Sequence, residues 1–208
     1  MTTITVTPDS IALAAQVIKS GGLVAFPTET VYGLGADALN PEAVKKIFIA
    51  KQRPQDKALI LHVNTIQQAS SLVEMNDEAL KLAERFWPGP LTLVLPAKEI
   101  VPSVTRAGLS TAAVRMPDNP AALALIEAAG TPLAAPSANL SGRPSPKDAQ
   151  AVLRDLDGRI DMIIDGGKTK IGTPSTIIDM TDPSRPVILR AGSISEQAAI
   201  MYNSKSHL

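Results

Sequence analysis

Cysteine is absent from the 208-residue sequence, and its absence excludes several kinds of chemistry. Without a thiol the chain has no disulfide framework, no thiolate nucleophile and no cysteine zinc site. Histidine is almost as scarce, since only His62 and His207 are present. The sequence also lacks the Gly-x-Ser-x-Gly motif of serine hydrolases. These absences favour a chemistry that needs neither a cysteine nucleophile nor a catalytic triad.

Aromatic side chains and net charge are also low. Aromatic residues make up 3% of the chain, so alanine and the aliphatic residues must fill most of the core. Twenty basic and twenty acidic residues cancel, and no overall field draws the protein to nucleic acid or anionic membranes. No apolar run approaches the roughly 20 residues of a membrane span, and the first residues lack a signal-peptide pattern. We expect a cytoplasmic protein with no membrane contact.

Turn residues and hydrophobic spacing divide the chain into helices and strands. The predicted helices span residues 8–20, 41–51, 66–75, 77–86, 119–129 and 148–156. The predicted strands span 23–26, 58–63, 91–95, 111–115, 132–135, 162–165, 175–179 and 186–190, with a glycine-rich strand or turn at 31–35. This irregular alternation predicts a mixed α/β sheet with helices packed on it. We expect one domain over residues 1–202 and a disordered tail at 203–208.

The first polar loop is Pro27-Thr-Glu-Thr-Val-Tyr-Gly-Leu-Gly35. Two threonine hydroxyls and a carboxylate at a strand end suit a small polar ligand, although an ordinary turn would use the same residues. Its glycines match neither a dinucleotide fingerprint nor a phosphate P-loop.

A second candidate groups three cations where a helix is expected to end. Lys51, Arg53 and Lys57 lie within seven positions of one another. They suit a polyphosphate, with Arg53 offering a planar fork and the lysines point charges. The alternative is a solvated helix end whose cations favour the negative pole of the helix dipole.

A third candidate is the predicted strand Thr111-Ala-Ala-Val-Arg115. Alternation places Thr111 and Arg115 on the same face. An arginine on that face suits a cleft where it pairs with a carboxylate, whereas an edge strand would expose Arg115 to solvent.

The fourth candidate follows another apolar strand, where Ser137 and Asn139 begin a loop rich in serine, glycine and proline. Its main-chain groups suit phosphate oxygens, as in an anion-binding nest. A structural turn would have a similar composition. His62, alone in its strand, is by itself more typical of a structural histidine than of a base.

Taken together, these segments resemble the YrdC-like threonylcarbamoyl-adenylate synthase family over about Ile11 to Gly192. Both signatures of the family, Lys-x-Arg and Ser-x-Asn, are intact as Lys51-Gln-Arg53 and Ser137-Ala-Asn139. The runs that carry the resemblance are Gly22-Leu-Val-Ala-Phe-Pro-Thr-Glu-Thr-Val-Tyr-Gly-Leu-Gly35, Ile47-Phe-Ile-Ala-Lys-Gln-Arg-Pro54, Trp87-Pro-Gly-Pro-Leu-Thr92, Val114-Arg-Met-Pro117, Pro136-Ser-Ala-Asn-Leu-Ser-Gly142 and Pro174-Ser-Thr-Ile-Ile-Asp179.

The resemblance implies a twisted, open α/β sheet with a large concave cationic cleft. It also implies the reaction of L-threonine, bicarbonate and ATP, with Mg²⁺, to threonylcarbamoyl-AMP, pyrophosphate and water. Partner transferase proteins would then deliver the threonylcarbamoyl group to adenosine 37 of tRNA. Because the chain ends 18 residues after Arg190, it resembles the single-domain type.

The resemblance also implies roles for individual residues. Those expected to hold L-threonine are Thr30, His62, Arg115, Ala135 (through its main chain) and Ser175. Those expected to hold ATP are Arg53, Lys57, Thr111, Ser137, Ser145 and Arg190. Lys51 and Asn139, with Arg53 and Ser137, complete the catalytic signatures. Relatives often carry Asn-Pro where this chain has Lys57-Ala58. A loop at 168–174 is a candidate for closing the cleft over the reactive intermediates.

Three alternatives stay open at this point. The first is a paralogue that binds nucleotide or RNA and makes little adenylate, which the intact signatures oppose. The second is a module that contacts tRNA or double-stranded RNA, which zero net charge and few aromatics oppose. The third is a carbamoyl-transfer domain of hydrogenase-maturation proteins, whose fused zinc-finger domains this cysteine-free chain lacks.

Overall fold

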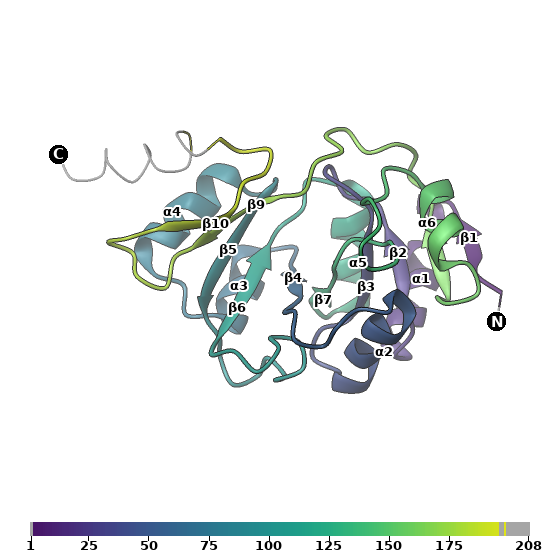
Figure 1. Ribbon diagram of the computed structural model, residues 1–208, viewed down its shortest axis with the longest axis horizontal. Coiled ribbons are helices and arrows are strands. Elements are labelled where there is room, and N and C mark those ends of the chain that lie inside the picture. The colour runs from purple at the N-terminus through teal and green to yellow at the C-terminus, as the bar shows by residue number, and fades with distance from the viewer. Residues whose placement is uncertain (1, 196–197, 199–208) are drawn as a thin grey trace.

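The computed structural model describes residues 2–195 and 198, and it is built around one mixed sheet of ten strands. The strand order is β1-β8-β2-β3-β7-β4-β6-β5-β9-β10, and Figure 1 shows the sheet crossing the width of the molecule. The sheet combines parallel pairs such as β4 with β6 and antiparallel pairs such as β5 with β6. The strands are β1 (Ile4–Val6), β2 (Val24–Phe26), β3 (Gly33–Asp37), β4 (Ile60–His62), β5 (Leu91–Pro96), β6 (Thr111–Arg115), β7 (Leu133–Ala134), β8 (Met162–Ile164), β9 (Thr176–Asp179) and β10 (Val187–Arg190).

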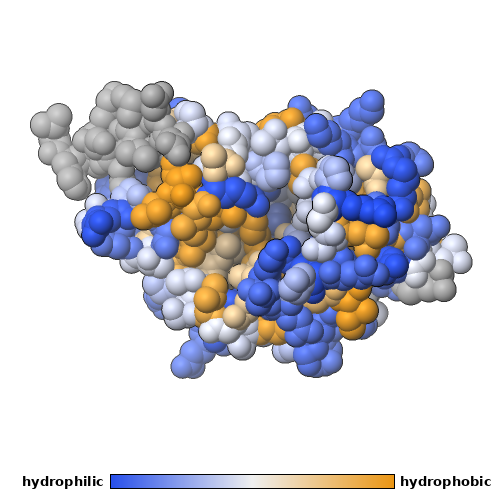
Figure 2. All heavy atoms as spheres, viewed as in Figure 1, coloured by the Kyte–Doolittle hydropathy of each residue, from blue (hydrophilic) through white to orange (hydrophobic). Residues whose placement is uncertain are grey.

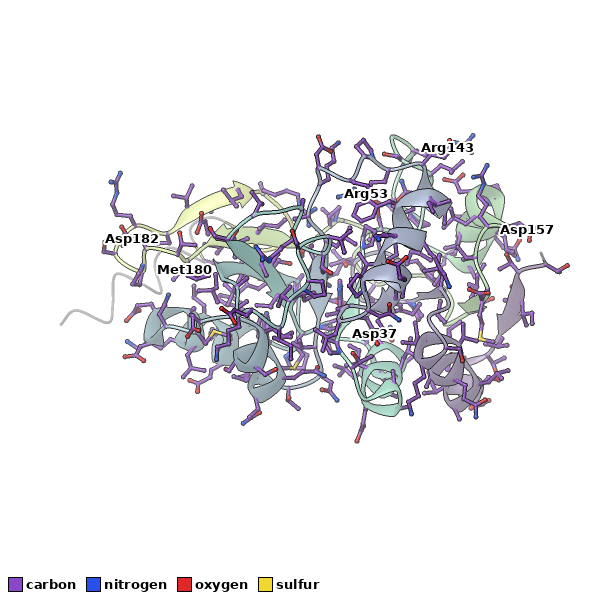
Figure 3. All side chains as sticks on the ribbon, turned by 90° about the horizontal axis from the view of Figure 1, so that it is seen from below. Asp37, Arg53, Arg143, Asp157, Met180 and Asp182 are labelled. Carbon is purple, nitrogen blue, oxygen red and sulfur yellow. The ribbon has the colours of Figure 1, made fainter. Side chains whose placement is uncertain are left out.

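Helices cover both faces of this sheet. They are η1 (Pro8–Ser10), α1 (Ile11–Lys19), α2 (Pro41–Lys51), α3 (Ile66–Leu72), α4 (Asp77–Phe86), α5 (Pro120–Ala129) and α6 (Ala149–Leu156). Figures 1 and 3 show α2 and α6 on one face, and α1, α3, α4 and α5 on the other. Helices α1 and α5 pack together and bury side chains such as Ile18 and Leu125 against the sheet. The predicted mixed α/β sheet with packed helices is confirmed.

Helix caps explain why the predicted helix starts agree so well with the structure. The Asn40 side chain accepts hydrogen bonds from the N–H groups of Glu42 and Ala43, and Pro41 begins α2. Asn119 does the same before Pro120 at the start of α5. An asparagine cap accepts hydrogen bonds from the free N–H groups of the first turn. A proline in that turn loses no hydrogen bond, because its missing N–H would have no partner within the helix. The helix start is therefore encoded locally.

Several elements differ from the sequence prediction. Strand β1 was not predicted, and it forms through long-range parallel pairing with β8. The helix predicted at 66–75 ends at Leu72, because Val73 forms a bridge with Ala97 in a neighbouring segment. The predicted tail at 203–208, and the last part of the predicted domain 1–202, lie outside the described residues. Among the described helices, none combines the length and the apolar character that crossing a membrane requires.

Candidate active site

A cavity of about 260 Å³ is lined by residues of β4 and of strands on both sides of it. This volume is close to the lower end of the range of about 300–1,000 Å³ for small-molecule sites. Figure 2 shows the surface hollowed near the middle of this face, between the hydrophobic surface over β9 and β10 and the hydrophilic surface around α2. Its wall comes from segments far apart in sequence, at the ends of strands and in the loops that follow. The polar residues of the wall are Thr28, Thr30, Tyr32, Arg53, His62, Arg115, Ser137, Ser145, Ser175 and Arg190.

The cavity is cationic. Arg53, Arg115 and Arg190 line it, and its wall, as far as the structure describes the chain, includes no aspartate or glutamate. Burial is the main cause that lowers the pKa of each of these three guanidinium groups, but arginine stays protonated in proteins. Figure 3 shows Arg53 just beyond the end of α2. Such a wall is complementary to an anionic ligand.

Arg115 ends strand β6, and the structure excludes the solvent-exposed edge position considered above. The strand lies between β4 and β5, and Arg115 is only 4% exposed. Its Nη2 donates to Glu29 Oε1 at 2.5 Å and to Thr30 Oγ1 at 3.0 Å. Its Nε donates to Gly89 O at 3.3 Å. No hydrogen bond among the described residues uses Nη1, so this nitrogen is available to a ligand.

His62 is neutral in the folded protein. Burial, followed by the charge of Arg115, lowers the pKa of His62 to about 3. Its Nδ1 lies 3.2 Å from the Ile60 carbonyl oxygen, and Phe26 packs edge-on against the ring. Since a carbonyl only accepts, Nδ1 must carry the hydrogen, and Nε2 is left as an acceptor. The cavity therefore offers a hydrogen-bond acceptor beside an arginine.

The loop after β7 forms another part of the wall, and it is held by main-chain bonds. Leu34 N donates to Pro136 O at 2.8 Å, and Ala138 N donates to Tyr32 O at 2.8 Å. Asn139 braces the loop from within, since its Nδ2 donates to Leu140 O at 2.8 Å. These contacts leave Ser137 in the cavity wall and Asn139 buried behind it.

Lys51 lies behind this loop rather than in the cavity wall. It is 2% exposed, and its Nζ donates to Ser137 O and, at 2.5 Å, to Asn139 O. Burial, and next the charge of Arg53, lowers the pKa of Lys51 to about 7. In this structure the Lys-x-Arg signature therefore divides into Lys51, which braces the Ser-x-Asn loop, and Arg53, which lines the cavity.

Ser175 connects two further strands to the cavity. Its Oγ lies 2.7 Å from Thr92 Oγ1 on β5 and accepts from Arg190 Nη2 at 3.0 Å. Arg190 Nε also donates to Ser175 O at 3.0 Å. These bonds fix the guanidinium of Arg190 at the end of β10, against the start of β9.

The structure brings most of the predicted site residues together. Every residue assigned to threonine lines the cavity, as do Arg53, Ser137, Ser145 and Arg190 from the ATP set. Lys57 is exposed and does not line the cavity. Thr111 also lies outside the wall, because it stands at the far end of β6 from Arg115, about 13 Å away at the usual rise per strand residue.

Three buried residues with structural contacts at the site had no individual role assigned from the sequence, although Glu29 and Tyr32 belong to the first candidate loop. Glu29 pairs with Arg115, Thr92 contacts Ser175, and the Tyr32 hydroxyl binds the main chain of Gly166 and Gly167. For Thr92, a polar side chain inside the apolar strand Leu91–Leu95 is the signal that could have found it. The loop predicted to close the cleft is fastened here, since Ile171 N and Gly172 N donate to Glu29 O and Thr30 O, each at 2.8 Å.

Comparison with known proteins identifies the family. A family model for Sua5, YciO and YrdC proteins, described as "Telomere recombination", matches residues 16–192. The chain is 57% identical over 185 residues to a Threonylcarbamoyl-AMP synthase of Pyrococcus abyssi, covering 88% of this chain and 54% of that protein. It is 55% identical over 190 residues to a Threonylcarbamoyl-AMP synthase of Bacillus subtilis, covering 90% of this chain and 54% of that protein.

A solved structure of a family member is also similar to this chain. The crystal structure of P. abyssi Sua5 complexed with L-threonine matches with a TM-score of 0.89 and 54% identity, over 93% of this chain and 58% of that one. The chain thus spans about half the length of these two curated relatives, and a single-domain type stays a prediction. A match over most of the chain in both sequence and structure shows that this protein belongs to the Sua5/YciO/YrdC family.

Proposed function

We propose that this chain binds L-threonine, bicarbonate and ATP and forms threonylcarbamoyl-AMP, pyrophosphate and water. The observation that carries the proposal is the single cavity that gathers Arg53, Arg115 and Arg190 with a neutral histidine and several hydroxyl groups. The P. abyssi structure with L-threonine and the names of the two relatives support it.

The end of the cavity near Arg115 suits the amino acid. The free Nη1 of Arg115 would bind the threonine carboxylate, in a charge-assisted hydrogen bond. Arg115 offers this one nitrogen rather than a bidentate pair, because its Nε and Nη2 are occupied. The Nε2 of neutral His62 would accept from the threonine hydroxyl or amine. A site that binds this hydroxyl rejects analogues without it, because a buried partner would be left unpaired.

Arg53, Ser137, Ser145 and Arg190 would hold the triphosphate. The wall offers cations and hydroxyls, which are partners for phosphate oxygens. Nowhere in residues 2–195 or at 198 do three or more His, Cys, Asp or Glu side chains gather into a metal site. We therefore propose that Mg²⁺ enters as the complex with ATP, held by the triphosphate.

The chemistry needs positioning and charge neutralisation rather than a protein nucleophile. The threonine amine adds to bicarbonate and releases water, which gives a carbamate. A carbamate oxygen then attacks the α-phosphorus of ATP, and the bond to pyrophosphate breaks. Arg53 and Arg190 would offset the charge that develops on the phosphate oxygens, and the fixed walls would hold the two reactants in line.

Pyrophosphate release tests this function directly. Purified protein with Mg-ATP, bicarbonate and L-threonine should release pyrophosphate, and omitting threonine should abolish the release. Replacing Arg53 with alanine should lower the rate by about 100-fold, on the scale of losing one stabilising donor. Arg185→Ala, an exposed arginine on the turn before β10, is the matched control and should keep the wild-type rate.

Two outcomes would count against the proposal. Pyrophosphate release that does not depend on threonine would defeat the assignment of the substrate. Tight nucleotide or RNA binding without any turnover would instead favour the paralogue that makes little adenylate. Transfer of the product to tRNA by partner proteins stays a prediction, as does direct contact with tRNA or double-stranded RNA.

A further inference from the structure

Glu29 is a buried carboxylate directly behind the cavity. It is 3% exposed and belongs to the loop between β2 and β3, but it is not part of the cavity wall. Its Oε1 accepts from Arg115 Nη2 at 2.5 Å, and its Oε2 accepts from Asp118 N at 3.1 Å. Both carboxylate oxygens are therefore used as acceptors, one for a side chain of the cavity and one for the chain that follows β6.

This ion pair is shielded from water on both sides. The Arg115 and Glu29 side chains are 5% and 3% exposed. Removing one member of a buried pair leaves the other charge uncompensated, which costs far more than the loss of a surface pair. The pair therefore places a strong constraint on the direction of the Arg115 guanidinium, to which Gly89 O and Thr30 Oγ1 add.

The three arginines of the cavity differ in whether a carboxylate compensates their charge. Glu29 neutralises Arg115, whereas no ion pair within the described part of the chain includes Arg53 or Arg190. A zwitterion such as an amino acid suits the compensated Arg115, because it carries no net charge. A polyanion suits Arg53 and Arg190, whose charges no carboxylate compensates in the described part of the chain.

We infer that Glu29 is the positioning residue of the amino-acid end of the cavity. This role rests on the proposed function. Glu29 holds Arg115 so that Nη1 points to the threonine carboxylate, and it cancels the positive charge of Arg115. Glu29 touches no reacting atom in this scheme. Its loss should therefore weaken threonine binding selectively and leave the ATP end intact.

Glu29→Gln is the sharpest test, because glutamine keeps the size of the side chain. Its single carbonyl oxygen can accept from Arg115 or from Asp118 N, but its amide nitrogen cannot accept from the other. In the full chain, the KM for L-threonine should rise at least tenfold, while the KM for ATP stays within twofold. Glu29→Asp retains the charge, so its KM for L-threonine should rise less than that of Glu29→Gln.

The matched control is Glu42→Gln, which removes an exposed carboxylate paired with Lys45 and should change neither KM. Thermal melts of all the variants report whether they fold. If Glu29→Gln does not fold, Glu29→Asp must still show a selective rise in the threonine KM. A structural role alone would lower the yield of active protein and leave both KM values unchanged.

The outcomes separate this inference from the proposed function. Wild-type protein that neither binds nor uses L-threonine would overturn both. Wild-type protein that uses threonine, together with Glu29 variants whose threonine KM is unchanged or whose two KM values rise equally, would overturn this inference alone.

Discussion

His62 shows how burial sets the charge of a single side chain at this site. Its pKa is about 3 in the folded protein, against 6.5 for free histidine. Between these two pH values the unfolded chain binds more protons at His62 than the folded chain does. The contribution of neutral His62 to the free energy of unfolding is therefore fully present above pH 6.5, and it is lost as the pH falls toward 3. The slope from this one group reaches at most about 1.4 kcal/mol per pH unit.

The variant His62→Gln should remove that contribution. We expect its free energy of unfolding to fall less steeply than that of the wild type between pH 6.5 and pH 4, as measured by urea denaturation. The exposed carboxylates titrate alike in both proteins and cancel in the difference. Two curves that stay parallel over this range would show that His62 titrates normally in the fold.

At the scale of elements, the site depends on how one loop is fastened to another. The Tyr32 hydroxyl donates to Gly167 O at 2.7 Å and accepts from Gly166 N at 3.1 Å. Burial raises the pKa of Tyr32 to about 12, so the hydroxyl remains a donor at any physiological pH. Together with the bonds from Ile171 N and Gly172 N, it holds the loop 166–174 against the segment 29–32.

Tyr32→Phe should loosen this loop. Gly166 and Gly167 are exposed, so water can replace the lost partner and the cost is about 0.5–1.5 kcal/mol for an ordinary hydrogen bond. Amide hydrogen exchange at Ile171 and Gly172 should become faster. The matched control is Ser71→Ala, which removes an exposed hydroxyl from α3 and should change exchange in neither loop residue. Unchanged exchange at these two amides in Tyr32→Phe would mean that the main-chain bonds alone fasten the loop.

At the scale of the whole molecule, the cavity wall joins segments from Thr28 to Arg190. A ligand that binds this wall stabilises only the folded chain, by about 2.7 kcal/mol at 100 times its Kd. We expect L-threonine and Mg-ATP each to raise the melting temperature of the wild type. Arg53→Ala should lose most of the shift from ATP and keep that from threonine. A variant that keeps both shifts would place the triphosphate elsewhere.

The elements that local chemistry encodes were predicted well. Helices α2 and α4 have the predicted bounds, because the asparagine caps and the residues that stop each helix act within a few positions. The mixed sheet followed from the irregular alternation of elements. Strand β1 was missed, since its three residues become a strand only by pairing with β8, far along the chain.

The residue types of the candidate site, and the family, could be read from the sequence by itself. What only the tertiary structure decided is which of these residues meet. Arg115 and Glu29 are far apart in the chain and form a buried pair, while Lys51 and Arg53 are two positions apart and face different partners. The physical reason is that motifs are local, whereas burial and pairing depend on which distant segments the sheet brings together.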